Sequence, residues 1–327
     1  MKLCMIGSRG HYGIVFEGLS LLTDVKIAGI SSGCEDDVTP LLKRCEAAGH
    51  TPAVYDDYLT MLDEVKPDMV CIDGPFDAHA QMCIDAFERN IHVFCEKPMA
   101  LTLGDLDRAQ AAYAKTKNLH FVSMVAMRYQ DDFSTAWKAV RDGAVGTVKL
   151  IRFQKSYKLG ERPPFYKSRK TYGGTIPWVG SHAIDFIYWF SQSGFKSVCS
   201  THTATDNFGF GDLEIAAQCQ FVMSNGIQAS ASIDYLRPAS APTHGDDRIR
   251  VAGTKGILEL INGTITLLDE AGSRTLPLEP SLPAFNDFVL RIKGDVPGRV
   301  DAAQTFEMTR ACLLARESAD SGVIVRF

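Results

Sequence analysis

The apolar residues in the first third of the chain come in short runs separated by amphipathic stretches. Short continuous apolar runs predict buried strands, and apolar residues spaced three or four apart predict helices. The runs predict strands at residues 3–6, 25–30, 69–72, 92–95 and 120–123. The stretches between them predict helices at residues 12–22, 36–48, 78–88 and 103–114. Strands that alternate with helices of these lengths are typical of parallel βαβ units, so residues 1–123 are predicted to form a Rossmann dinucleotide-binding domain.

The pattern changes after about residue 128. Helices are expected at residues 133–141, 181–190, 285–292 and 302–318, and strands at 149–157, 198–204, 214–223, 227–235, 248–252, 257–261 and 264–268. Turn signals such as Ser224-Asn225-Gly226 and Asn262-Gly263 separate the later strands, which is typical of antiparallel hairpins. We therefore predict an α/β protein in which residues 124–327 form a second, substrate-binding α+β domain with a large, mostly antiparallel open sheet.

The composition narrows the range of functions. With 327 residues, of which 46% are hydrophobic and 22% charged, the chain is typical of a globular protein with more than one core. Its net charge of -5 argues against nucleic-acid binding, which needs an excess of Lys and Arg. The 9 cysteines include no C-x-x-C pair, and no apolar run is long enough to span a bilayer. We expect a cytoplasmic protein with no membrane partner and no bound metal.

A glycine-rich turn follows the first predicted strand and opens the first predicted helix. Glycines in such a turn let the backbone approach a pyrophosphate closely, and the start of the helix supplies N–H donors. The spacing is G-x-x-G-x-x-G where G-x-G-x-x-G is usual, so a plain glycine-rich turn is the alternative interpretation. The cofactor contacts predicted from this turn are Gly7, Ser8, Arg9, Gly10, His11, Tyr12 and Gly13.

The end of the second predicted strand bears on which dinucleotide binds. An Asp or Glu at this position normally binds the ribose 2′-hydroxyl, but here the strand ends in Ser31 and Ser32. Together with Arg9, these hydroxyls can accommodate a 2′-phosphate. The cofactor is therefore predicted to be NAD(P), with a preference for NADP. The alternative is that Glu35 or a backbone group binds the ribose and that NAD is preferred.

The strongest local signal is the sequence His92-Val93-Phe94-Cys95-Glu96-Lys97-Pro98, in which a predicted buried strand ends in an acid, a base and a proline. Ligands of open α/β sheets bind at the carboxyl ends of the strands, so Lys97 is expected beside a bound nicotinamide. A lysine in that position can hydrogen-bond a substrate hydroxyl and stabilise the alkoxide that forms as a hydride leaves.

Several motifs together resemble the glucose-fructose oxidoreductase/inositol dehydrogenase family, written Gfo/Idh/MocA. They are Pro75 and His79 after the strand at 69–72, Glu96-Lys97-Pro98, Arg128-Tyr129, and Gly180-Ser181-His182-Ala183-Ile184-Asp185. The resemblance covers essentially the whole chain. It implies hydride transfer at a secondary hydroxyl of a sugar, cyclitol or related polyol, and homo-oligomers, dimers or tetramers, that pair through the C-terminal sheet. It also implies that Lys97 and His182 are active-site residues.

On this resemblance, His182 is predicted to accept the hydroxyl proton, because an imidazole titrates near neutral pH. Asp185, one helical turn later, either orients the imidazole or makes a structural hydrogen bond within the second domain. Many family members have an Asp where this chain has Trp178, which either stacks on a sugar ring or packs in the domain junction. The cofactor set is completed by Ser31, Ser32, Pro75, His79, Glu96 and Lys97. The predicted substrate set is Lys97, Arg128, Tyr157, Tyr172, Trp178, His182 and Asp185.

Residues 155–170 carry six cationic side chains against the single acid Glu161. This stretch either borders a pocket for a carboxylate or phosphate or forms a solvated loop. Two other functions stay open. Some relatives use tightly held NAD for a transient oxidation that enables glycoside cleavage or epimerisation, and Trp178 would fit such a divergence. A dinucleotide-binding protein without catalysis is disfavoured because Lys97 and His182 are both present.

Overall fold

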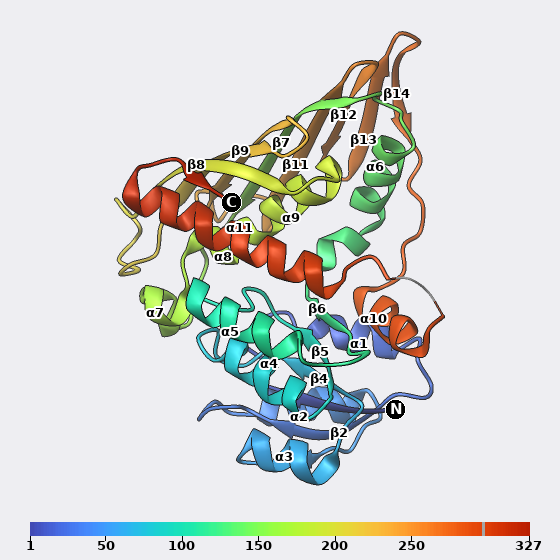
Figure 1. The fold of residues 1–327 in the computed structure, drawn as a ribbon, viewed down its shortest axis with the longest axis vertical. Helices are drawn as coiled ribbons and strands as arrows, with labels where there is room; N and C mark the ends of the chain where they lie inside the picture. The colour runs from blue at the N-terminus through green and yellow to red at the C-terminus, as the bar shows by residue number, and fades with distance from the viewer. Residues whose placement is uncertain (296–297) are drawn as a thin grey trace. The chain divides into compact units, whose positions relative to one another are not determined.

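Residues 1–295 and 298–327 are described by a computed structural model, whose backbone divides into two units (Figure 1). The first unit contains Met1–Ala126 together with Leu282–Thr309, and the second contains Met127–Ser281 together with Arg310–Phe327. Within the described residues, no helix is both long enough and apolar enough to cross a membrane.

The first unit is built on a six-stranded sheet in the order β3-β2-β1-β4-β5-β6 (Figure 1). All of its paired strands are parallel: β1 (Lys2–Ile6), β2 (Lys26–Ser31), β3 (Ala53–Val54), β4 (Met69–Ile72), β5 (His92–Cys95) and β6 (Phe121–Ser123). The central strands are buried almost throughout because helices cover both faces of a parallel sheet. This order confirms the predicted Rossmann fold. Strand β3 was not predicted, since its two residues are exposed and carry no apolar pattern.

Helices connect these strands: α1 (Gly13–Leu19), α2 (Thr39–Ala47), α3 (Tyr58–Val65), α4 (His79–Glu88) and α5 (Leu103–Tyr113). Two of them begin at side-chain caps. Asp57 accepts a hydrogen bond from Thr60 N at 2.8 Å, and Thr102 accepts one from Asp105 N at 3.1 Å. Helix α3 was not predicted.

A segment from late in the chain packs on the first unit. The apolar face of α10 (Ala284–Lys293) contacts strand β5, where the Phe94 ring lies 5.5 Å from the Phe285 ring and 5.3 Å from the Phe288 ring. Asn286 Nδ2 donates to Gly18 O of α1 at 3.1 Å. The division predicted between residues 123 and 124 stays a prediction, and the structure adds that Leu282–Thr309 packs with the N-terminal sheet. Helix α11 (Ala302–Ser321) begins in the first unit and ends in the second.

The second unit contains a nine-stranded sheet in the order β14-β13-β12-β11-β7-β10-β9-β8-β15. Its strands are β7 (Val148–Tyr157), β8 (Phe195–Thr203), β9 (Ala216–Met223), β10 (Gln228–Asp234), β11 (Gly245–Gly253), β12 (Gly256–Ile261), β13 (Thr264–Asp269), β14 (Gly272–Leu276) and β15 (Val325–Arg326). Every neighbouring pair is antiparallel except β7 and β10. This confirms the predicted large, mostly antiparallel sheet.

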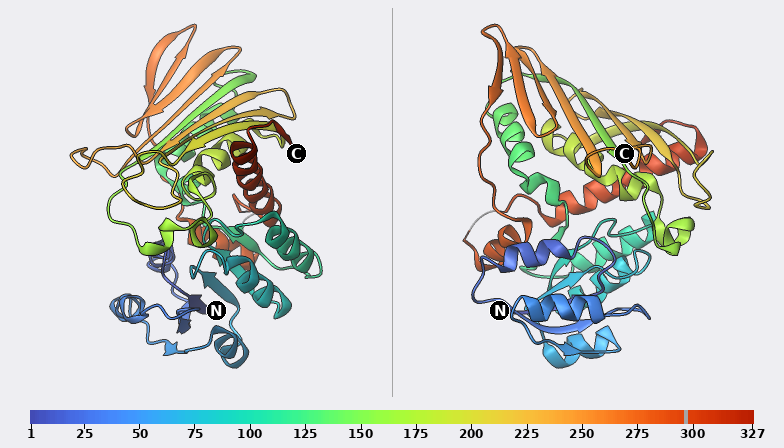
Figure 2. Two further views of the ribbon diagram at one scale, coloured as in Figure 1. Left: turned by 90° about the vertical axis from the view of Figure 1, so that its left-hand side faces the viewer. Right: turned by 180° about the vertical axis from the view of Figure 1, so that it is seen from behind.

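Helices cover one face of this sheet (Figure 2). Residues at alternate positions of β7 point to that face, where the Phe153 ring lies 5.0 Å from Phe186 of α9 (Gly180–Ser191). Helix α6 (Asp131–Arg141) packs beside α9, with the Trp137 and Trp189 rings stacked 4.7 Å apart. The sheet therefore fixes α9, the helix that carries His182.

We expect the contact between α10 and β5 to stabilise the first unit. Replacing the buried side chain in Phe285→Ala leaves a cavity beside Phe94, and such truncations cost about 3–5 kcal/mol in the free energy of unfolding. Chemical denaturation of the full chain measures this loss. The control is Phe208→Ala, at a ring that is 71% exposed, which should cost less than about 1 kcal/mol. Equal losses for the two variants would contradict the packing described.

Candidate functional site

The turn after β1 lies against the turn after β4. Gly7 has a φ of +79°, and a Cβ atom built on it would lie 2.4 Å from Gly74 Cα. Neither the left-handed backbone nor this contact tolerates a side chain, so glycine is required here by the protein's own backbone. The two turns flank the boundary between β1 and β4, where the strand order reverses and where Rossmann folds bind dinucleotides.

Three consecutive amides of the glycine turn donate to buried carboxylates at the ends of β4 and β5. Gly10 N and Tyr12 N donate to Asp73 Oδ1 and Oδ2 at 2.7 and 2.8 Å, and His11 N donates to Glu96 Oε2 at 2.6 Å. A Cβ on Gly10 would lie 2.7 Å from Glu96 Oε2. The second glycine of the pattern therefore makes room for the two carboxylates.

The two carboxylates differ in how they are balanced. Burial, and then the neighbouring Glu96, raise the pKa of Asp73 well above its ordinary value. Burial also acts to raise the pKa of Glu96, but His11 and Lys97 outweigh it and hold that pKa below its usual range. His11 Nδ1 lies 2.7 Å from Glu96 Oε2, and Lys97 N donates to Glu96 Oε1 at 2.8 Å. Glu96 is thus the charged member of the pair, and Asp73 is the member that protonates more readily.

Lys97 begins the turn after β5, and its side chain is buried. His79 braces this turn from α4: its Nδ1 lies 3.0 Å from Pro98 O and its Nε2 lies 3.1 Å from Gly74 O. Burial lowers the pKa of His79, so the ring is neutral near pH 7 and donates to one of the two carbonyls. His79 is fully buried, and its two ring contacts join the turns after β4 and β5. Pro75, in the turn after β4, is half-buried.

The remaining predicted cofactor residues lie in the glycine turn after β1 and at the end of β2. Arg9 Nη2 donates to Asp36 Oδ1 at 2.9 Å, and its Nε donates to Asp36 Oδ2. The hydrogen bonds from Arg9 lower the pKa of Asp36. The Ser32 hydroxyl donates to Cys34 O, and Ser31 Oγ accepts from Gly33 N at 3.4 Å. Ser8 lies in the glycine turn and Gly13 begins α1, and both residues are half-buried. Strand order and the close approach of the turns fit a dinucleotide at this edge of the sheet, although the turn amides are already bonded.

In the second unit, the predicted substrate residues Arg128 and Asp185 form a buried ion pair. Arg128 donates through Nε at 2.8 Å and through Nη2 at 2.6 Å to the two carboxylate oxygens of Asp185. The guanidinium also lies 5.3 Å from the centre of the Trp189 ring. This is the structural alternative that the sequence left open for Asp185, and it ties the segment after Ala126 to α9.

His182 lies in the first turn of α9, and Trp178 lies just before this helix. Trp178 ends α8 (Thr175–Trp178), and its carbonyl accepts from Ser181 Oγ at 2.6 Å. Both side chains are 5% exposed. A Cβ on Gly180 would lie 2.6 Å from Ile233 Cδ1 of β10, so the glycine lets α9 approach the sheet closely. The Gly-x-His segment thus sets the distance between His182 and the sheet.

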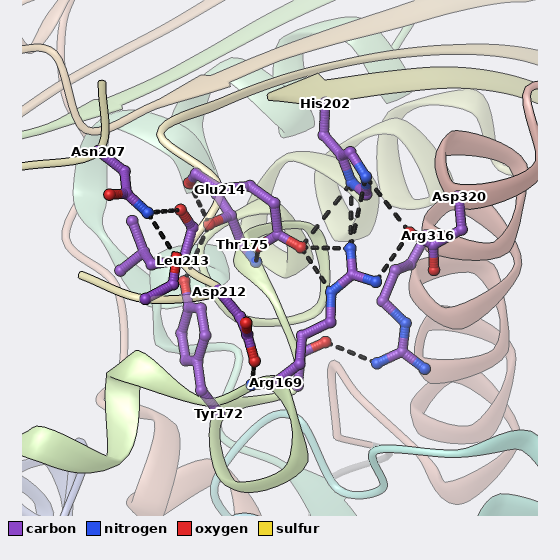
Figure 3. A network of polar contacts seen from close by, with 12 residues as sticks. Arg169, Tyr172, Thr175, His202, Asn207, Asp212, Leu213, Glu214, Arg316 and Asp320 are labelled. Carbon is purple, nitrogen blue, oxygen red and sulfur yellow. Dashed lines mark hydrogen bonds and ion pairs between the residues drawn. The ribbon is translucent and has the colours of Figure 1, made fainter. Parts of the chain in front are cut away.

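The turn that leads into α8 is fixed by a polar network (Figure 3). Buried Glu214 accepts from Arg169 Nε at 2.7 Å and from Thr175 N at 2.9 Å, while Arg316 Nη1 donates to Gly173 O at 2.6 Å. Tyr172 is fully buried, and its hydroxyl lies 2.8 Å from that of Tyr235. Tyr172 therefore anchors the turn within the second unit.

Sequence analysis missed a buried ion pair between Lys155 and Asp247. These residues lie directly opposite each other on β7 and β11, with Lys155 Nζ 2.6 Å from Asp247 Oδ2 and 3.0 Å from Met127 Sδ. The ammonium also lies 4.5 Å from the centre of the Tyr157 ring, which in turn lies 4.9 Å from that of His244. The available signal was a lysine on the core-facing side of β7, in line with Ile151 and Phe153.

Burial drives both members of this pair toward their neutral forms. It lowers the pKa of Lys155 and raises that of Asp247, and in each case the attraction to the partner opposes the shift. Asp247 Oδ1 is buried and has no hydrogen-bond partner among the described residues. The end of the sheet where β7 and β11 meet thus combines a cation, an aromatic ring and a buried acceptor without a hydrogen-bond partner among the described residues.

Comparisons with known proteins agree with this architecture. A family model described as "Oxidoreductase family, NAD-binding Rossmann fold" matches residues 3–124, and one described as "GFO/IDH/MocA C-terminal domain" matches residues 133–259. A solved structure from Thermotoga maritima, described as a candidate oxidoreductase, is 44% identical and covers 100% of both chains with a TM-score of 0.96.

Two relatives are more distant. An uncharacterised oxidoreductase of Bacillus subtilis, YrbE, is 28% identical over 260 residues, which is 77% of this chain and 71% of its own. A myo-inositol 2-dehydrogenase of Thermotoga maritima is 24% identical over 279 residues, which is 84% of this chain and 80% of its own.

We expect Lys155→Met to destabilise the second unit in a pH-dependent way. Leaving Asp247 buried without its cation costs about 3–5 kcal/mol in the free energy of unfolding near neutral pH. Because the pKa of Asp247 is raised in the folded state, the carboxyl protonates on acidification. The loss should therefore shrink as pH falls toward about 4 and grow as pH rises through that raised pKa.

Chemical denaturation near neutral pH and at about pH 4 measures this change in the free energy of unfolding. Lys149→Met, at an exposed lysine of the same strand, is the matched control and should change little. The double variant Lys155→Met/Asp247→Leu should recover part of the loss, since no charge is left buried. A loss for Lys155→Met that is the same at both pH values would show that Asp247 is not the group left unbalanced.

Proposed function

The chain belongs to the Gfo/Idh/MocA family of oxidoreductases, and from this premise we propose that it moves a hydride between a nicotinamide dinucleotide and a secondary hydroxyl carbon of a sugar, cyclitol or related polyol. The observation that carries the proposal is the setting of Lys97, which is buried at the carboxyl end of β5 beside Glu96 and Asp73. The myo-inositol 2-dehydrogenase among the relatives supports a polyol as the substrate class.

Lys97 is proposed to bind the substrate hydroxyl and to stabilise the alkoxide. Its charge acts on both Asp73 and Glu96, so its ammonium lies close to the two carboxylates. His79 fixes the following carbonyl of Pro98, which limits how far this turn can move. The bound dinucleotide would supply the hydride acceptor or donor. A cation held in place before the reaction stabilises developing negative charge without reorganisation of its surroundings.

His182 is proposed to exchange the hydroxyl proton, as the family resemblance implies. Its imidazole lies on the first turn of α9, and the side chain is buried. Close packing of Gly180 on Ile233, together with the ion pair of Asp185 and Arg128, holds the helix that carries it. A proton acceptor on a rigid helix loses little conformational freedom when the substrate binds.

The end of the sheet where β7 and β11 meet is proposed to bind hydroxyls of a substrate. Tyr157 offers an apolar ring face beside the Lys155 ammonium, and Asp247 Oδ1 is an acceptor without a protein partner among the residues described. A sugar or cyclitol combines an apolar face with several hydroxyl donors. Asp247 therefore joins Tyr157 and Trp178 as a proposed substrate residue.

We propose that the cofactor is NAD and not NADP. The sequence-based preference for NADP depended on Arg9 as a partner for a 2′-phosphate. In the structure, Arg9 donates through Nε and Nη2 to the carboxylate of Asp36 instead. An adjacent carboxylate repels a phosphate and accepts hydrogen bonds from ribose hydroxyls.

Lys97→Met and His182→Ala should each lower kcat by about a hundredfold or more, because each removes a group that acts in the transition state. Formation of reduced dinucleotide from a panel of sugars, cyclitols and sugar acids measures the rate. Lys117→Met, at an exposed lysine of the same unit, is the control and should keep the wild-type rate. A drop of less than about tenfold in Lys97→Met would refute its role.

Binding of NADH should be at least about tenfold tighter than binding of NADPH, as measured by titration calorimetry. Asp36→Ser removes the carboxylate that accepts from Arg9 and should narrow the ratio of the two dissociation constants. Asp37→Ser, one residue further on and exposed, should leave this ratio unchanged. A wild-type preference for NADPH would overturn the assignment.

A further inference from the structure

Three amides of the glycine turn, those of Gly10, His11 and Tyr12, already donate to the protein's own carboxylates. Asp73 accepts from Gly10 N and Tyr12 N through both of its oxygens, at 2.7 and 2.8 Å. A dinucleotide that binds at this edge of a Rossmann sheet places its pyrophosphate against such amides. The pyrophosphate and the Asp73 carboxylate are both anions, so they compete for the same donors.

We propose that Asp73 gates cofactor binding: the dinucleotide is accepted when Asp73 takes up a proton and gives up hydrogen bonds from the turn. This inference rests on the proposed function only in assuming that the chain binds a nicotinamide dinucleotide. A neutral Asp73 has one donor and reduced acceptor strength, and it no longer repels the two phosphate charges.

The proton goes to Asp73 and not to Glu96, because the two carboxyls have different partners. Glu96 accepts from His11 N, His11 Nδ1 and Lys97 N. Both of these residues have basic side chains. The donors that the Asp73 carboxylate accepts from are the backbone amides of Gly10 and Tyr12. Burial raises the pKa of Asp73 well above its ordinary value, whereas the pKa of Glu96 lies below its own.

The charged and titratable groups that face Asp73 come from three elements. Glu96 and Lys97 lie at the end of β5, His11 lies in the glycine turn, and Cys71 lies on β4. Burial raises the pKa of the Cys71 thiol far above neutrality, so this group stays neutral. His11 Nδ1 lies 2.7 Å from Glu96 Oε2, so the contribution of this ring is separated by a variant of its own.

The test is titration calorimetry of the full chain with NADH and with NADPH between about pH 6 and pH 9, in pairs of buffers with different ionisation enthalpies. The wild type should take up close to one proton per dinucleotide bound, and its Kd should rise by up to about tenfold per pH unit. Asp73→Asn should take up no proton, and its Kd should be independent of pH and lower than that of the wild type at the alkaline end.

Three further variants keep the test sharp. Asp63→Asn removes an exposed carboxylate of the same unit and should behave like the wild type. His11→Gln should keep the proton uptake if Asp73 is its source. Asp73→Ser removes the carboxylate while keeping a short hydrogen-bonding side chain, and it replaces Asp73→Asn if that variant melts early.

Each outcome decides between the two hypotheses. Binding by the wild type and by both Asp73 variants with the same proton uptake overturns the gate and leaves the proposed function standing. If the Asp73 variants bind a dinucleotide and the wild type does not, the gate is supported, because the charged carboxylate then blocks binding. If neither wild type nor Asp73 variants bind NADH or NADPH, both the gate and the dinucleotide assignment are wrong.

Discussion

The hydrogen bonds between the glycine turn and the two carboxylates Asp73 and Glu96 are the constraint on which the first unit depends. The parallel register of β1, β4 and β5 brings the ends of these strands together, and amides left unpaired there would cost about 1–3 kcal/mol each. Glu96 is held charged by His11 and by its neighbour Lys97. The position of Lys97 is thus fixed by the same contacts that close the turn, so the proposed chemistry and the local stability share one set of interactions.

The second unit meets a related requirement with ion pairs. Arg128 with Asp185 and Lys155 with Asp247 place charges among apolar side chains, where each charge is costly unless it is fully paired. The first pair is bidentate and fixes α9. The second leaves one carboxylate oxygen without a protein partner in the described chain. In contrast to Asp185, whose two carboxylate oxygens both accept from Arg128, Asp247 has one oxygen in an ion pair and one buried oxygen without a partner among the described residues.

Much of this architecture could be predicted from the sequence, because continuous apolar runs indicate strands buried on both faces and apolar residues three or four apart indicate helices. The predicted strands at residues 69–72 and 92–95 coincide with β4 and β5. Pairing partners were beyond reach: Asp185 with Arg128, and Lys155 with Asp247, are joined across 57 and 92 residues by a register that no local pattern encodes. The short elements β3, β15 and α8 were missed, since two to four residues hold no measurable period.

The glycine motif shows how a correct fold prediction can rest on an incomplete physical reason. Gly7 is required by its contact with Gly74, and Gly10 is required by the oxygens of Asp73 and Glu96. Both requirements arise within the protein, so the spacing would be needed even if no dinucleotide bound. This turn differs from a plain glycine-rich turn in having a buried lysine, Lys97, at the end of a nearby strand. The backbone amide of Lys97 donates to Glu96, one of the two carboxylates that also accept from the turn. A plain structural turn has no need of that lysine, and a buried lysine among carboxylates at the end of a parallel strand is typical of a site of binding or chemistry.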